Sequence, residues 1–472
     1  MGWRLGVGAT VTTALALFGG YLVADAYDVV PGMVTLEPPH SSPAPFPSVP
    51  GATPGPSPEV AVPPLDDDAP VPDAAAVDEL VTALVDDNRL GNRVGVMVSD
   101  AGTGDVVAAS GENRLMVPAS TQKILTAVAA HAGPGGEVTL PTRAMLQDDS
   151  QLILQGGGDM MLAAGAGDPD AVNGRAGLGD LADQVVAEIG LSGRDTVSLA
   201  VDDTLFTGPD VAPTVRASDA RDGYVAPVAA LAVDVARLTD DKYAQRQDDP
   251  ALAAAETFAE QLADRGITVT GQITRQAAPS SSREIGRVDS APLGDIVDYF
   301  LVESDNTLTE VVGRLVAIDV GLPGSLDAAI GEVMSQVEAQ GVDLTGAELT
   351  DLSGLGQGSR MTATQLVDTL GVAVQEPALR EAATGLPVAG LEGTLADRFP
   401  PDSAGRAYTR AKTGSLPDTR GLSGTVVTAD DRLLLFTVLA DRIPEGQSWG
   451  ANVIIDDFVD DLAACGCSAD GP

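Results

Sequence analysis

Ser120-Thr121-Gln122-Lys123 is the stretch that decides the predicted fold of this 472-residue chain. Lysine occurs only three times among the 27 cationic residues, and Lys123 is one of the three. An ammonium group can lose its proton when it is desolvated or placed near another cation, whereas a guanidinium in a protein cannot. Because positions three apart share one face of a helix, Lys123 is a candidate base beside a candidate nucleophile, Ser120.

The residues around this stretch predict a helix over 122–132. Its apolar residues recur at helical spacing: Ile124, Leu125, Val128 and Ala129. The segment Gly133-Pro134-Gly135 then stops the pattern. Serine is a preferred helix N-cap, so we expect Ser120 to lie at or near the start of this helix.

Two further motifs follow in the sequence: Ser304-Asp305-Asn306 and Lys412-Thr413-Gly414-Ser415. Each of the three patterns, serine-x-x-lysine, serine-x-asparagine and lysine-threonine-glycine, occurs once and in this order. Any one of them alone is a weak signal, since an ordinary cap, turn or strand would explain it. Together they are specific, because this set is typical of penicillin-binding proteins and class A β-lactamases.

The serine in such a set needs a base, since a hydroxyl is a poor nucleophile until a neighbouring group takes its proton. The only histidines are His40 and His131, so a Ser-His-Asp triad is not supported, and His131 remains an alternative base. Lys123 is the expected base. We expect Lys412, in the same pocket, to lower the pKa of Lys123 by like-charge repulsion.

The other motif residues supply groups that an amide substrate needs. Asn306 can donate and accept through its amide, and Ser304 can relay a proton between the lysines and the leaving nitrogen. Lys412, Thr413 and Ser415 are predicted on an edge strand, where a cation and two hydroxyl groups suit a terminal carboxylate.

The glycine of the third motif has its own predicted role. Gly414 would let the edge strand approach a substrate backbone closely. This strand is one of three antiparallel strands predicted over 409–415, 421–427 and 432–439. A final amphipathic helix over 450–464 is expected to pack through four apolar residues: Val453, Ile454, Phe458 and Leu462.

An antiparallel sheet with helices before and after it predicts an α+β fold. Residues 76–135 and 291–472 are expected to form one domain of this kind. Residues 136–290 alternate short strand-like and helical runs, and they are expected to form one or two inserted accessory domains.

The N-terminus predicts export from the cytoplasm. Within residues 1–30, Arg4 precedes an apolar run over 5–24 that is long enough to cross a bilayer. This length favours a retained membrane anchor over cleavage near Ala24-Asp25-Ala26. Residues 31–75 are rich in proline and predict an extended, disordered linker. The formal net charge of −41 argues against nucleic acid as a partner.

Cys465 and Cys467 are the only cysteines. They could form a short, strained disulfide or stay as two free thiols, and the sequence leaves both open. Too few cysteines and histidines are present for a zinc site, and no metal or other cofactor is predicted.

Three segments imitate sites of other kinds. Gly156-Gly157-Gly158-Asp159 lacks the Gly-Lys-Ser/Thr ending of a phosphate loop, so a tight turn is predicted. Residues 353–358 imitate part of a dinucleotide fingerprint, but the last glycine is misplaced and a loop is predicted. Lys242 is flanked by Asp240 and Asp241 and is expected in a solvated ion pair.

The motifs and their spacing resemble the class C low-molecular-mass penicillin-binding proteins, the D-alanyl-D-alanine carboxypeptidase/endopeptidase family. Ser304 follows Lys123 by 181 positions, which resembles the inserted accessory domains of that family and is too long for a class A β-lactamase. Three more stretches strengthen the resemblance: 152–159, 351–355 and 386–395. Members often carry glycine where Leu352 stands and an asparagine near Asp234, so this chain departs from the family there.

The resemblance implies a penicillin-binding/serine β-lactamase-like transpeptidase fold and a serine peptidase of the bacterial envelope that acts on peptidoglycan stem peptides and binds β-lactams. It implies that Ser120 attacks a D-Ala-D-Ala peptide bond, with the backbone N–H groups of Ser120 and Ser415 as oxyanion donors. Two alternatives stay open. One is a wall-peptide-binding or β-lactam-sensing domain without turnover, and the other is a β-lactamase, for which no local motif supplies a deacylating glutamate.

Overall fold

The computed structural model describes residues 21, 65, 68–148, 150–190 and 193–466. The chain divides into two compact units, Met1–Pro64 and Leu65–Pro472, and every element below belongs to the second. The anchor predicted within 1–30 lies outside the described residues except for Tyr21, as does most of the linker predicted over 31–75. Within the described part of the chain, no helix combines the length and apolar character needed to cross a membrane.

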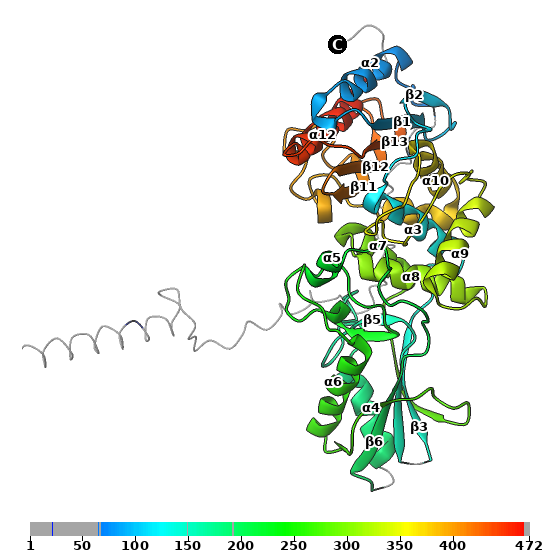
Figure 1. Ribbon diagram of the computed structural model, residues 1–472, viewed down its shortest axis with the longest axis vertical. Coiled ribbons are helices and arrows are strands. Elements are labelled where there is room, and N and C mark those ends of the chain that lie inside the picture. Colours follow the sequence, from blue (N-terminus) through cyan, green and yellow to red (C-terminus); the bar gives the residue numbers. More distant parts are fainter. Residues whose placement is uncertain (1–20, 22–64, 66–67, 149, 191–192, 467–472) are drawn as a thin grey trace, which may run out of the picture. The chain divides into compact units, whose positions relative to one another are not determined.

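The first sheet has five antiparallel strands in the order β11-β12-β13-β1-β2 (Figure 1). Its strands are β1 (Val94–Asp100), β2 (Val106–Ser110), β11 (Thr409–Leu416), β12 (Thr419–Val427) and β13 (Leu433–Ala440). The three C-terminal strands were predicted within two residues of these bounds. β1 pairs with β13, so the two ends of the folded chain meet in one sheet.

Helices cover both faces of this sheet. Because successive side chains of a strand point to opposite faces, β13 contributes to two cores. Phe436 and Val438 pack in the core that includes α2 and α12, whereas Leu435 and Leu439 pack in the core that includes α3 and α10. These helices are α2 (Ala74–Val85), α3 (Lys123–Ala132), α10 (Ala363–Gln375) and α12 (Ser448–Ala464). The result is a three-layer arrangement, and the predicted α+β class is confirmed.

The buried face of α12 differs in part from the prediction. Phe458 and Leu462 are buried as predicted, but Val453 and Ile454 are only half-buried. Ile454 still packs against this core as predicted, and the fully buried Ile455 shares the face of Phe458 and Leu462, because it lies three and seven positions before them.

The second sheet is contained in the predicted insertion, 136–290. Its strand order is β10-β3-β4-β6-β8, with β9 also pairing with β6. Helices α4 and α6 pack against this sheet (Figure 1). The bounds are β3 (Pro141–Gln147), β4 (Gln151–Gln155), β6 (Thr196–Asp202), β8 (Thr268–Val269), β9 (Thr274–Arg275), β10 (Arg283–Asp289), α4 (Leu178–Gly190) and α6 (Pro250–Asp264). A smaller sheet pairs β5 (Asp159–Leu162) with β7 (Leu231–Val233).

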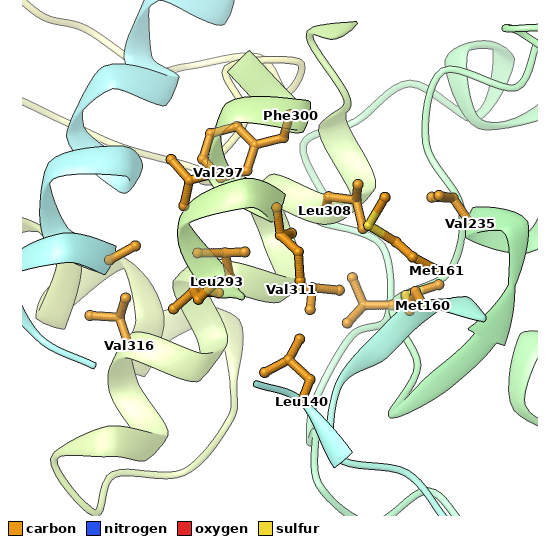
Figure 2. Packing of buried hydrophobic residues seen from close by; sticks show 14 of the residues in the cluster. Leu140, Met160, Met161, Val235, Leu293, Val297, Phe300, Leu308, Val311 and Val316 are labelled. Carbon is orange, nitrogen blue, oxygen red and sulfur yellow. The ribbon is translucent and has the colours of Figure 1, made fainter. Parts of the chain in front are cut away.

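The insertion shares its hydrophobic core with two helices that follow it, α7 (Leu293–Glu303) and α8 (Asn306–Asp319). Figure 2 shows Leu140, Met160 and Met161 of the insertion in one cluster with Leu308 and Val311 of α8. The position of α8 therefore depends on packing from both sides. The division into domains at 135 and 291 stays a prediction.

The other helices are α5 (Ala217–Arg221), α9 (Leu326–Ala339) and α11 (Arg380–Thr384). α9 packs against α3 and α8, so α3 is enclosed by helices on the side away from the sheet. Cys465 directly follows α12, and Cys467 lies outside the described residues, so the choice between a disulfide and two free thiols stays open.

Candidate active site

Ser120 lies in a single 3-10 turn, Ala119–Gln122, at the head of α3. The predicted position near a helix start is confirmed, but Ser120 does not cap the helix. Thr121 holds the turn instead, because its Oγ1 donates to the carbonyl of Pro118 at 2.7 Å. The Ser120 hydroxyl is therefore free to face Lys123, whose Nζ lies 3.0 Å from Ser120 Oγ.

Lys123 is completely buried and its Nζ makes two further hydrogen bonds. It donates to Oδ1 of Asn306 at 2.7 Å and to the backbone carbonyl of Ser353 at 2.7 Å. The Asn306 amide is oriented by its own Nδ2, which donates to the carbonyl of Tyr224 at 2.8 Å. Two carbonyl oxygens thus accept hydrogen bonds from two N–H groups of Lys123, and the remaining tetrahedral position of Nζ faces Ser120.

Burial lowers the pKa of Lys123 to about 8, and the negative charges of Asp351, Glu310 and Asp305 act in the opposite direction. The prediction that Lys412 provides the lowering is therefore wrong, since burial is the main cause. The repulsion between the two lysines instead lowers the pKa of Lys412, in addition to the effect of its burial.

Lys412 is also completely buried, on the edge strand β11. Its Nζ donates to Ser304 Oγ at 2.9 Å and to the carbonyl of Thr413 at 3.2 Å. Burial lowers its pKa well below the usual lysine value, and the charges of Lys123 and Lys242 lower it more. Ser304 itself has left-handed backbone angles (φ 57°, ψ 36°) at the junction of α7 and α8.

The outer edge of β11 presents the backbone of Ser415. Ala411 N–H donates outward, to the carbonyl of Pro387, and not to β12. Residues of an antiparallel strand alternate between its two edges, and the pairing of β11 with β12 is regular. The N–H groups of Thr413 and Ser415 therefore also face outward, which leaves Ser415 N–H available at the edge.

Gly414 has a structural role that the sequence did not predict. A Cβ at this position would lie 2.8 Å from the carbonyl oxygen of Pro118 and 3.2 Å from Cγ2 of Thr121. The glycine thus lets β11 approach the turn that carries Ser120. Its predicted contact with a substrate backbone is a separate expectation.

A cavity of about 620 Å³ opens over these groups. It is lined by five residues of the predicted motifs: Ser120, Ser304, Asn306, Thr413 and Ser415. Lys123 and Lys412 lie buried behind this wall. The structure therefore brings all three motifs together at one cavity, although they are separated by more than a hundred positions in the sequence.

The rest of the cavity wall could not be predicted from the motifs. Charged residues of both signs line it: Arg216, Asp219, Asp222, Arg398 and Arg420. Tyr224 and Tyr243 from the insertion also line it, with ring centroids 4.9 Å apart. The insertion thus forms part of the site.

Residues 353–358 form a loop, as predicted, and this loop belongs to the site. Gly354 has φ +75°, and a Cβ there would lie 2.0 Å from the carbonyl oxygen of Ala119. The loop therefore packs directly against the serine turn. Leu352, where the family often has glycine, packs against Gly313 of α8, since a Cβ on Gly313 would lie 2.4 Å from Leu352 Cδ1.

Lys242 forms a solvated ion pair, as predicted, and its partner is Glu303 at 2.9 Å. His131 is buried near the end of α3, eleven positions after Ser120 and roughly 16 Å along a helix axis. Its Nδ1 lies 3.6 Å from Oε2 of Glu381, so it is not the base beside Ser120.

Comparison with known proteins identifies the class and then the family. The chain resembles the crystal structure of penicillin binding protein 4 from Haemophilus influenzae with a TM-score of 0.66 at 22% identity, over 81% of this chain and 98% of that one. The fold is therefore that of the penicillin-binding proteins. The family of D-Ala-D-Ala carboxypeptidase 3 (S13) matches residues 76–240 and 237–458.

Two sequence relatives extend over most of the chain. Carboxypeptidase DacB of Mycolicibacterium smegmatis is 34% identical, covering 97% of this chain and 95% of that protein. A carboxypeptidase of Mycobacterium tuberculosis is 32% identical, covering 86% and 87%. The chain belongs to the D-Ala-D-Ala carboxypeptidase 3 (S13) family of serine peptidases, and the predicted resemblance to class C penicillin-binding proteins is confirmed.

Proposed function

We propose that Ser120 is the nucleophile of a D-Ala-D-Ala carboxypeptidase and that Lys123 is its general base. One observation carries this proposal. Lys123 Nζ lies 3.0 Å from Ser120 Oγ while two acceptor oxygens hold its other directions. A neutral amine held in this way directs its lone pair at the serine hydroxyl. The lowered pKa of Lys123, about 8, makes the neutral form accessible.

The acylation step follows from these positions. Ser120 Oγ forms a bond to the carbonyl carbon before the terminal D-Ala, and its proton moves to Lys123 Nζ. The backbone N–H groups of Ser120 and Ser415 stabilise the negative carbonyl oxygen. The C–N bond then breaks, and Ser304, which lies 2.9 Å from Lys412 Nζ, relays to the leaving nitrogen the proton that Lys123 took from Ser120, so that Lys123 becomes neutral again and Lys412 keeps its charge. Water hydrolyses the acyl-enzyme afterwards.

The terminal carboxylate of the substrate is assigned to the β11 edge. Lys412 supplies the positive charge there, and Thr413 and Ser415 supply hydroxyl groups. Thr413 Oγ1 is held by Thr394 Oγ1 at 2.9 Å, which keeps it at the cavity wall.

The proposed function is tested with a fluorescent penicillin, because a β-lactam should acylate the same serine. We expect the wild-type chain to be labelled and Ser120→Ala not to be. Equal labelling of the two proteins would overturn the assignment. A D-alanine release assay then separates a peptidase from a binding or sensing domain, which would be labelled without turnover, and rapid nitrocefin hydrolysis would indicate a β-lactamase.

We also propose cleavage of peptide cross-links as a second activity. A cavity of about 620 Å³ with charges of both signs on its wall is larger than a dipeptide needs. The test compares D-alanine release from monomeric muropeptides with cleavage of cross-linked ones. Cleavage of monomeric substrate alone would restrict the enzyme to the carboxypeptidase reaction.

The proposed place of action is the bacterial envelope, where such substrates occur. We propose that residues 1–30 export the chain and hold it at the membrane. Fractionation of cells that express the full chain tests this, since release of a shortened protein into the medium would contradict a retained anchor.

A further inference from the structure

Two buried carboxyl groups behind Lys123 take no part in the steps proposed above. The exposed fraction is 4% for Glu310 and 0% for Asp351. Glu310 lies one helical turn after Asn306 on α8, so the two side chains share the face that is directed at Lys123. Buried carboxylates are costly unless they are hydrogen-bonded, so their partners indicate what they do.

Glu310 binds two successive backbone amides. Its Oε1 accepts from the N–H groups of Leu352 and Ser353, each at 3.0 Å. Its Oε2 is buried and has no hydrogen-bond partner within the described part of the chain. The carboxyl group of Glu310 thus connects helix α8 to the backbone of the loop that follows Asp351.

Asp351 binds the next part of the same loop. Its Oδ1 accepts from Gly354 N–H at 2.9 Å, and its Oδ2 accepts from Gly356 N–H at 2.6 Å and from Ser353 Oγ at 3.1 Å. Gln122, in the serine turn, donates through Nε2 to the backbone carbonyl of Asp351 at 2.5 Å. Together the two carboxyl groups accept hydrogen bonds from four backbone amides of this loop, those of Leu352, Ser353, Gly354 and Gly356.

The loop held in this way touches both reacting groups. The carbonyl of Ser353 accepts from Lys123 Nζ at 2.7 Å, and the N–H of the same residue is bound by Glu310. Gly354 packs against Ala119, next to Ser120. A shift of the loop would therefore change the direction of the Lys123 lone pair.

The two carboxyl groups also act on Lys123 through their charge. Negative charge on Asp351, Glu310 and Asp305 raises the pKa of Lys123 against the effect of burial. Burial and the neighbouring Asp351 raise the pKa of Glu310 to about 7, against the hydrogen bonds from Leu352 and Ser353 that favour its charged form. Two buried cations also belong to these surroundings: burial and then the charge of Lys123 lower the pKa of Lys412, and burial lowers the pKa of Arg314 against the charge of Glu310.

We propose that Glu310 and Asp351 are positioning residues of the acyl-transfer reaction, which hold the Ser353 carbonyl against Lys123 and balance its ammonium form after it takes the serine proton. This inference rests on the proposed function of Lys123 as the base for Ser120.

The test is the rate constant for acylation by a fluorescent penicillin, measured as a function of pH for Glu310→Gln and Asp351→Asn. Glu310→Gln keeps an acceptor for both amides and removes only the charge. Loss of a negative charge lowers the pKa of Lys123, so the rise of the rate with pH should move to lower pH by about one unit. Glu338→Gln on α9 is the matched control, since its side chain is exposed and it is not among the charges that act on Lys123, and its profile should coincide with the wild type.

A purely structural role predicts a different result. Folded variants, verified by circular dichroism and thermal unfolding, would then lose rate at every pH without a displaced profile, and this would overturn the inference. If Glu310→Gln does not fold, the pH profile of Asp351→Asn shows whether the inference holds. If Asp351→Asn does not fold, the profile of Glu310→Gln shows it. Failure of the proposed function is distinguishable, because the wild type would then be labelled no better than Ser120→Ala.

Discussion

The two buried lysines of the site have opposite surroundings. Lys123 is faced by the charges of Asp351, Glu310 and Asp305, whereas the charges that act on Lys412 are those of two other lysines. Burial lowers the pKa of both. Carboxylates beside a lysine stabilise its ammonium form, so such a lysine can take up a proton during a reaction and hold it. A buried lysine that has no carboxylate beside it is stabilised most by a carboxylate that arrives with the substrate. The difference in their surroundings therefore suits Lys123 to proton transfer and Lys412 to substrate binding.

The largest effect is expected from Lys123→Arg, which removes the base and keeps the charge. Because a guanidinium in a protein stays protonated, acylation of Ser120 by a β-lactam should slow by about 10³-fold. The measurement is the second-order rate constant for labelling at fixed pH. Lys242→Arg, an exchange of the same kind at a half-exposed lysine, serves as the control and should keep nearly full activity.

Lys412→Arg should cost less than Lys123→Arg. The charge that binds the carboxylate is retained, so a loss of about 10- to 100-fold is expected, and it should be larger in KM than in kcat for D-alanine release. If Lys412→Arg proves the more damaging of the two changes, the division of roles between the lysines is wrong.

The contact between the loop 353–358 and the turn that carries Ser120 can be tested by a substitution at Gly354. In Gly354→Ala the new Cβ would meet the Ala119 carbonyl oxygen at 2.0 Å, in addition to the strain of φ +75°. We expect a loss of about 3 kcal/mol of stability together with slower acylation. Gly346→Ala is the matched control, because Gly346 has φ +80° but no atom lies near the added Cβ, so about 1 kcal/mol is expected. Equal losses in urea unfolding would show that the contact with the serine turn is unimportant.

The smallest effect belongs to Lys242→Ala on the Lys412 side. Its ion pair with Glu303 is exposed, at 40% and 36% of the two side chains, so stability should change by less than about 0.5 kcal/mol. Removal of this positive charge raises the pKa of Lys412, which favours carboxylate binding, so KM for D-alanine release should fall by about twofold or less. A tenfold loss of activity would mean that Lys242 takes part in the site directly.

The sequence predicted the motif residues but not the surroundings that distinguish the two lysines. Lys412 is predicted on an edge strand, since three consecutive strand-like runs and the turn between the last two are visible locally. Helix α8, which carries Asn306 and Glu310, was missed because it is rich in β-branched residues and contains Gly313, both unfavourable for a helix. Burial of the helix on several sides overrides that preference.

The partners of Glu310 and Asp351 could not be predicted for another reason. They are backbone amides of a loop, which carry no sequence signal, and the fold alone brings this loop to Lys123. The cavity residues from the insertion were missed for a similar reason, since Asp219 and Tyr224 belong to no motif and reach the site only through the packing of the insertion on α7 and α8.

The most direct test of the central claim is the pH dependence of Ser120 acylation in the wild-type enzyme. Lys123 must be neutral to accept the serine proton, and its pKa of about 8 lies below the ordinary lysine value because it is buried. A group with a lowered pKa gains the neutral form as pH rises through that value, so the rate should increase with pH and reach half its maximum near pH 8. A rate that does not change across this range, or a rise centred near the ordinary lysine pKa of about 10.4, would contradict the account.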